Sequence, residues 1–142
     1  MTTSRNTDDA LEGGILEALD GLLLALELEP LGEDRFRAHS EPDRFGRVFG
    51  GQMLAQALDA ACITVDDKPP HSMHAYFVQA GSPERPIDVA VERVRDGRSM
   101  AARRVTLIQD GRPVLIAMVS FHDNPTEPLF GDTPPTVPRP DC

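Results

Sequence analysis

The stretch VFGGQMLAQALDAACI, residues 48–63, decides the fold of this chain. It opens with two glycines and is then apolar on nearly every side, interrupted by Gln52, Gln56 and Asp59. At about 100° per residue these three polar residues fall within about 60° of one another. Because a helix that is apolar almost all round is buried, we expect an enclosed helix over residues 51–63 with one narrow polar stripe.

Four strands are expected after this helix. Alternating apolar residues predict strands over 72–79, 87–94, 99–109 and 113–122. The pairs Asp96-Gly97 and Asp110-Gly111 separate the last three strands, and such pairs favour tight hairpin turns because glycine accepts a positive φ. One enclosed helix followed by long antiparallel strands indicates an α+β fold with a curved sheet around a central helix. A ferredoxin-like topology would need a second helix among the strands, and none is predicted.

The two ends of the chain differ from this central part. Residues 1–12 are polar without periodicity and are predicted to be disordered. Leucines recur at three- and four-residue steps within residues 14–28, which predicts an amphipathic helix packing its leucine face on the domain. A short strand over 34–39 and a loop over 40–47 follow. Residues 125–142 are rich in proline and are predicted to form a linker or tail, leaving one domain over 13–124.

Composition excludes several classes of protein. A net charge of -9 argues against nucleic acid as a partner. The apolar stretch 15–28 contains acidic residues and is too short to span a bilayer, so no membrane segment is expected. The chain has two cysteines and a polar N-terminus without a secretory signal, which predicts a cytoplasmic protein.

Three motifs carry a resemblance to a known family. They are V-F-G-G-Q at 48–52, H-S-x-H-x-Y-F at 71–77 and R-D-G-x-S-x-x-x-R-R-V at 95–105. Over about Leu16 to Phe121 the chain resembles the N-terminal half of type II acyl-CoA thioesterases, which join two hot-dog domains. The resemblance implies an α+β hot-dog fold with an extra N-terminal amphipathic helix.

The same resemblance implies a function. It is the hydrolysis of fatty acyl-CoA to free fatty acid and CoA, with no cofactor or metal. It also implies a partner, which is either a second copy in a homodimer or a second hot-dog domain. In the family the catalytic Asp, Ser or Thr, and Gln belong to the second hot-dog domain, so none of them maps onto a position of this sequence.

The glycines that open the central helix are the first candidate site. N–H groups at Gly51 and Gln52, beside Gly50, would form an oxyanion hole in which the helix dipole stabilises the charge developing on a thioester oxygen. The alternative is a tight turn into the helix where only glycine fits. Both interpretations stay open on the residues alone.

The polar stripe of the helix is the second candidate. Asp59 would act as a general base that deprotonates a water, with Gln56 as a substrate-binding or orienting residue. The alternative is a structural aspartate paired with an arginine such as Arg104. These alternatives also stay open.

Two further residues are candidate ligand contacts. His71 lies at the start of a strand, near where a ligand would meet the helix N-terminus, and would bind substrate or fix the preceding proline loop. His71 and His74 lie on opposite faces of an extended strand, so they do not form a metal pair. Six arginines between residues 85 and 104 alternate with acids and indicate a solvated strand surface, although a small subset, with Arg98 as the candidate, could face a phosphate-bearing ligand.

Three functions therefore remain open. The first is an acyl-CoA thioesterase or one half of one. The second is a non-catalytic hot-dog module that supplies packing surface and part of an acyl-CoA pocket. The third, a hot-dog dehydratase, would need a histidine–acid pair near the helix, for which only His71 is available.

Overall fold

The computed structural model describes residues 5–40, 46–123, 131, 133, 135 and 136. Residues 1–4, residues 41–45 of the expected loop and most of the proline-rich segment lie outside the described residues, so their predictions stay predictions. Two helices and six strands follow one another in the order α1 (Arg5–Leu26), β1 (Leu28–Gly32), β2 (Arg35–Ala38), α2 (Gly50–Ile63), β3 (Pro70–Phe77), β4 (Ile87–Asp96), β5 (Met100–Gln109) and β6 (Arg112–His122).

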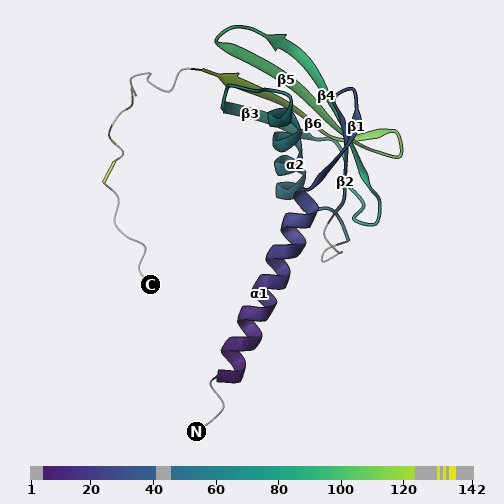
Figure 1. Cartoon of the computed structure of the whole chain (residues 1–142), viewed down its shortest axis with the longest axis vertical. Coiled ribbons are helices and arrows are strands. Elements are labelled where there is room, and N and C mark those ends of the chain that lie inside the picture. The colour runs from purple at the N-terminus through teal and green to yellow at the C-terminus, as the bar shows by residue number, and fades with distance from the viewer. Residues whose placement is uncertain (1–4, 41–45, 124–130, 132, 134, 137–142) are drawn as a thin grey trace.

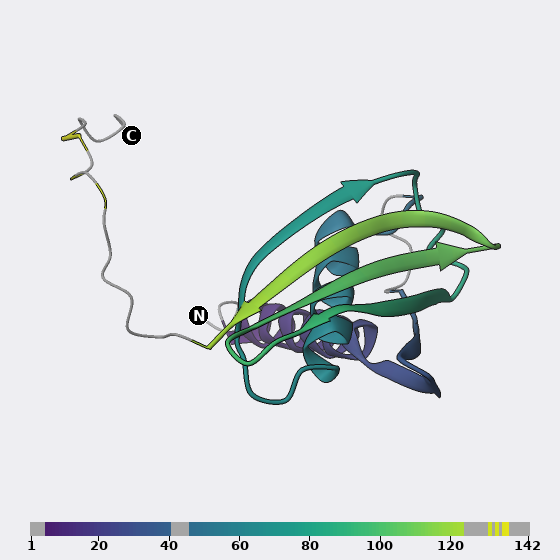
Figure 2. The same ribbon diagram turned by 90° about the horizontal axis from the view of Figure 1, so that it is seen from above.

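The six strands form one antiparallel sheet in the order β1-β2-β4-β5-β6-β3. The sheet arches over α2, as Figure 2 shows. Small side chains on the helix, at Ala57, Ala60 and Ala61, are fully buried and let its backbone approach the strands closely. The core between helix and sheet is completed by residues such as Val89, Val105, Leu107, Leu115, Val119 and Phe121. The predicted α+β hot-dog fold is thereby confirmed.

Helix α2 is buried on one side only. Its opposite side carries Leu54, Leu58 and Cys62, which are half-buried. The expectation of a helix enclosed all round was therefore wrong for the single domain. The sheet covers one face of a helix, and the second apolar face is more than this domain can bury by itself.

Helix α1 differs most from its prediction. It begins at Arg5 and so includes residues 5–12, which we expected to be disordered. It projects away from the sheet beyond the end of α2 (Figure 1). Among its described side chains only Ala25 is buried, while leucines such as Leu16 and Leu23 are exposed. The predicted packing of the leucine face on the domain is therefore wrong, because only the C-terminal end of α1 reaches the domain. Within the described part of the chain, neither helix has the length and apolarity needed to cross a membrane.

Strand β1 was not predicted, and it pairs with β2 at the edge of the sheet. The hairpin between β5 and β6 has the predicted primed turn, since Asp110 and Gly111 have φ values of 51° and 73°. The β4–β5 hairpin does not: Gly97 has no positive φ, and its N–H donates to the carbonyl of Met100 at 2.8 Å. The two-residue turn predicted at Asp96-Gly97 was wrong, because a longer connection replaces it.

The arginine-rich region is also not a uniform solvated surface. Arg93 pairs with Asp34 and Arg104 with Glu92 at exposed or partly exposed positions. Arg103, in contrast, is only 1% exposed. It alternates along β5 with the buried Ala101 and Val105, so the strand period places it on the inner face of the sheet.

Candidate functional site

The N-terminus of α2 has no side-chain cap. Phe49 is the N-cap residue, with extended backbone angles of φ -64° and ψ 130°, and its ring cannot accept a hydrogen bond from the helix. The first N–H groups of a helix have no acceptor within it. The sequence therefore places an apolar residue where Ser, Thr or Asp would otherwise cap the helix, and a ligand oxygen can accept from the N–H of Gly51 there.

Two aromatic rings border this helix N-terminus. A Cβ atom added to Gly51 would lie 2.5 Å from the ring of Phe49, and one added to Gly50 would lie 3.1 Å from the ring of Phe77. A side chain at Gly51 would therefore displace the ring of Phe49, whereas one at Gly50 would move the ring of Phe77 only slightly. Both rings are more than half exposed, at 65% for Phe49 and 54% for Phe77. They make an open apolar border around the candidate donors.

The two glutamines of the polar stripe bind the backbone. Gln52 and Gln56 both donate to the carbonyl of His39, at 3.3 and 3.0 Å. Gln56 also donates to the carbonyl of Ala25 at 2.6 Å. These bonds hold the ends of α1 and β2 against α2. Both glutamine side chains therefore have a structural role in addition to the role in substrate binding or catalysis that the sequence predicted. The Oε1 atom of Gln56 is buried without a partner among the described residues.

Asp59 lies at the edge of the buried arc of α2 and is exposed. Among the described residues its carboxylate makes no hydrogen bond or ion pair, and Arg104, its suggested partner, binds Glu92 at 3.1 Å instead. The suggested Asp59–Arg104 pair is therefore wrong: Arg104 points from the outer face of β5, away from the helix. Asp59 follows Gly51 by eight residues, which is about 12 Å along the helix axis.

Cys62 is one turn further along α2. Desolvation raises the pKa of its thiol, and the nearby carboxylate of Asp59 raises it further. The thiol is therefore protonated at neutral pH, which does not suit a nucleophile.

His71 and Arg98 lie at the opposite end of α2 from its glycines. Strand β3 runs back along the helix, so Phe77 contacts the helix N-terminus while His71, six residues earlier, is about 20 Å away along the strand. The expectation that His71 lies near the helix N-terminus was thus wrong. It bonds through Nε2 to the hydroxyl of Ser120 at 3.0 Å. Arg98 belongs to the β4–β5 connection at that same far end.

The sequence analysis proposed Gly50, Gly51 and Gln52 as part of a site, which stays a prediction, and it did not include the two phenylalanines beside them. Phe77 closes the H-S-x-H-x-Y-F motif, and Phe49 belongs to V-F-G-G-Q, so both signals were present in the sequence. The missing step was the direction of β3. A connection of a few residues after α2 obliges the strand to start at the helix C-terminus and to finish at its N-terminus.

Comparisons with known proteins agree with this architecture. Residues 39–122 match the family model of the acyl-CoA thioesterase N-terminal domain. Human acyl-coenzyme A thioesterase 8 is 43% identical over 118 residues, which is 82% of this chain and 37% of the human protein. Acyl-CoA thioesterase 2 of Haemophilus influenzae is 39% identical over 106 residues, which is 74% of this chain and 37% of that protein.

A solved structure shows the same arrangement of elements. The tesB protein of Mycobacterium avium subs paratuberculosis superposes with a TM-score of 0.76 at 37% sequence identity, over 86% of this chain and 49% of that one. The chain thus spans less than half the length of these relatives. It belongs to the type II acyl-CoA thioesterase family, in which it corresponds to the N-terminal hot-dog domain.

Proposed function

We propose that this chain hydrolyses acyl-CoA thioesters as one member of a hot-dog pair. The observation that carries the proposal is the N-terminus of α2, where Phe49 leaves the helix without a side-chain cap and two exposed phenylalanine rings border the glycines. A thioester carbonyl oxygen can accept from the backbone N–H of Gly51, with Gln52 beside it. The helix dipole then stabilises the negative charge that develops on this oxygen.

The rest of the reaction needs a base and a water. The carboxylate of Asp59 accepts a proton from the water as the water oxygen attacks the carbonyl carbon. The tetrahedral intermediate collapses with cleavage of the carbon–sulfur bond, and the CoA thiolate leaves and takes up a proton. The fatty acid is released as the second product.

A single domain cannot join these groups at one point, because Asp59 is about 12 Å along α2 from Gly51. A two-fold or pseudo-two-fold pair of antiparallel helices would bring one member's Asp59 to the other member's glycines. Two features support such pairing: the apolar second side of α2, and the edge strand β3, which ends at the exposed Phe77 and is followed by the exposed Val78. The partner is a second copy of the chain or a second hot-dog domain.

A thiol-release assay on acyl-CoAs of several chain lengths tests this function. We expect the purified chain to release CoA, and Asp59→Asn to reduce the rate by roughly 10²–10⁴-fold, as for the loss of a general base. Asp20→Asn, at an exposed position on α1, is the matched control and should leave the rate unchanged. Full activity of Asp59→Asn would remove Asp59 from the mechanism.

The second candidate function is a non-catalytic module that binds acyl-CoA and packs against a catalytic domain. The distance between Asp59 and the glycines within one chain favours it. Binding of acyl-CoA without any thiol release would support the module over the enzyme.

A further inference from the structure

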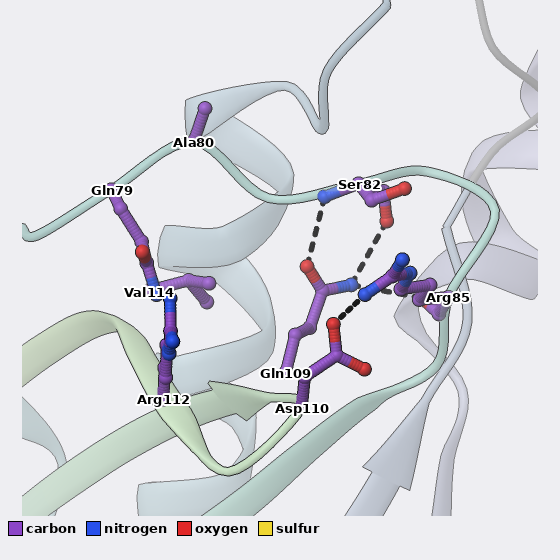
Figure 3. A pocket seen from close by; sticks show the side chains of 8 residues that line it. All are labelled: Gln79, Ala80, Ser82, Arg85, Gln109, Asp110, Arg112 and Val114. Atoms are coloured by element: carbon purple, nitrogen blue, oxygen red, sulfur yellow. Dashed lines mark hydrogen bonds and ion pairs between the residues drawn. The ribbon is translucent and has the colours of Figure 1, made fainter.

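A polar cavity of about 390 Å³ lies between residues 79–85 and the β5–β6 hairpin (Figure 3). It is close to the loop that leads into α2, because the N–H of Val48 donates to the carbonyl of Gly81 at 2.9 Å. The cavity and the candidate oxyanion donors therefore share one end of the molecule. The proposed reaction gives no role to the residues that line it.

The shape of this cavity is fixed by one buried amide. Gln109 is 7% exposed, and its Oε1 accepts from the N–H of Ser82 at 2.8 Å. Its Nε2 donates to the carbonyls of Ser82 and Arg85, both at 2.9 Å. These three bonds hold the turn after residue 81 against the end of β5, so the wall of the cavity is preorganised.

Two arginines face the cavity from opposite sides, as Figure 3 shows. Arg85 forms an ion pair with Asp110. The guanidinium of Arg112 makes no hydrogen bond or ion pair with any described residue. Two guanidiniums and one carboxylate leave the cavity with a net charge of about +1 on a chain whose net charge is -9.

A second cavity, of about 370 Å³, provides a contrast. It lies over β2, β4 and β5, and its lining contains Arg35 and Arg104 together with Glu33 and Glu92. The two positive charges there are balanced by two negative ones. Of these two cavities, only the one beside the α2 loop carries a net positive charge.

We propose that the cavity at Arg112 binds the phosphate-bearing nucleotide end of a CoA thioester. The identity of the ligand rests on the proposed function; the preference for a phosphate rests on the arginines. A guanidinium presents five donors in a planar fork that matches phosphate oxygens. Arg85 can therefore keep its bond to Asp110 and still donate to a ligand, while Arg112 is the principal contact.

Titration calorimetry with CoA, 3′-dephospho-CoA and inorganic phosphate tests this site on the full chain. We expect Arg112→Gln to raise the Kd for CoA by about 10-fold or more, as for the loss of a charge-assisted hydrogen bond. Arg112→Lys should recover part of the affinity because it keeps the charge. Arg35→Gln removes an exposed arginine from the balanced cavity and should leave the Kd unchanged. Thermal melts of each variant establish that it is folded.

The outcomes separate this inference from the proposed function because binding is measured without turnover. CoA binding that depends on Arg112 supports the site even if no thiol is released. An equal Kd for the wild-type chain and Arg112→Gln, or no binding of CoA to the wild-type chain, overturns it. Binding of inorganic phosphate that depends on Arg112, without binding of CoA, also overturns it and assigns the cavity to a simple phosphate.

Discussion

The guanidinium of Arg103 on β5 donates to both the hydroxyl and the carbonyl oxygen of Thr64, at 2.8 and 2.9 Å, where α2 ends. It also donates to the carboxylate of Asp96 at 2.6 Å and to two backbone carbonyls. The carbonyl groups at a helix C-terminus carry partial negative charge and lack partners within the helix. A buried cation thus joins the end of the central helix to the middle of the sheet.

Replacing this cation should be costly. We expect Arg103→Met to lower the free energy of unfolding by about 3 kcal/mol, since it leaves buried acceptors without donors. Arg104→Met is the control from the same strand: its exposed pair with Glu92 should contribute no more than about 1 kcal/mol. Urea denaturation of both variants measures the difference. Equal losses would show that Arg103 has no special role at the helix end.

The pair of Asp34 and Arg93 predicts a pH dependence. Hydrogen bonds from Arg93, at 2.6 and 2.9 Å, lower the pKa of Asp34 below its ordinary value of 3.8. A lowered folded-state pKa stabilises the fold above the ordinary pKa, and this stabilisation is lost as the pH falls through the folded-state pKa. Asp34→Asn keeps a residue that tolerates the positive φ of this position.

We therefore expect the wild-type chain to be more stable than Asp34→Asn at pH 7 by about 0.5–1 kcal/mol, the range for a largely exposed pair. The difference should hold down to about pH 4 and vanish below it. Chemical denaturation at a series of pH values measures it. A difference that grows as the pH falls would contradict this assignment.

Self-association should depend on one face of β3. Phe77 lies on the α2 side of the sheet, where a partner helix would pack, and Tyr76 points to the outer side. We expect the wild-type chain to form dimers at micromolar concentration, Phe77→Lys to shift them towards monomers, and Tyr76→Lys to have a smaller effect. Light scattering coupled to gel filtration reports the masses. A monomeric wild-type chain would contradict the pairing.

The sequence predicted the fold because its strongest signals are periodic and local. The apolar run after Gly51 predicted α2, and the Asp110-Gly111 pair predicted the β5–β6 hairpin. Strand β1 was not predicted; it contains Pro30 and Gly32, and proline is tolerated there because β1 is an edge strand. The packing of α1 was missed because an amphipathic pattern does not reveal which surface a helix covers.

The candidate site was predicted less completely because it depends on the direction in which each strand runs relative to α2. The glycines are adjacent in the sequence and open α2 as expected, and their role in a site stays a prediction. The distance of His71 from them follows from the antiparallel run of β3 along α2, which residue types do not show. The alternation of side chains along the strand predicts that Arg103 faces inward with Ala101 and Val105. The arginine was nevertheless assigned to a solvated surface because it is charged. The cavity at Arg112 is lined by two segments about thirty residues apart in the sequence. The sequence pattern alone therefore does not show that Arg85 and Arg112 lie in one cavity.

The position of β3 beside β6 also bears on how the chain reaches its fold. Strands β4, β5 and β6 are joined by hairpins, whereas β3 must close a loop that contains β4 and β5 before it pairs. Loop closure of this kind slows the formation of non-local contacts. The kinetic φ-value of a substitution is the fraction of its effect on stability that is already present in the folding transition state. We expect this value to be well above that of Met73→Ala, in β3, for Val105→Ala, at the centre of the three hairpin-linked strands. We therefore expect β3, the strand that a partner would cover, to pair only after the three hairpin-linked strands have formed, so that the surface for assembly is completed late in folding.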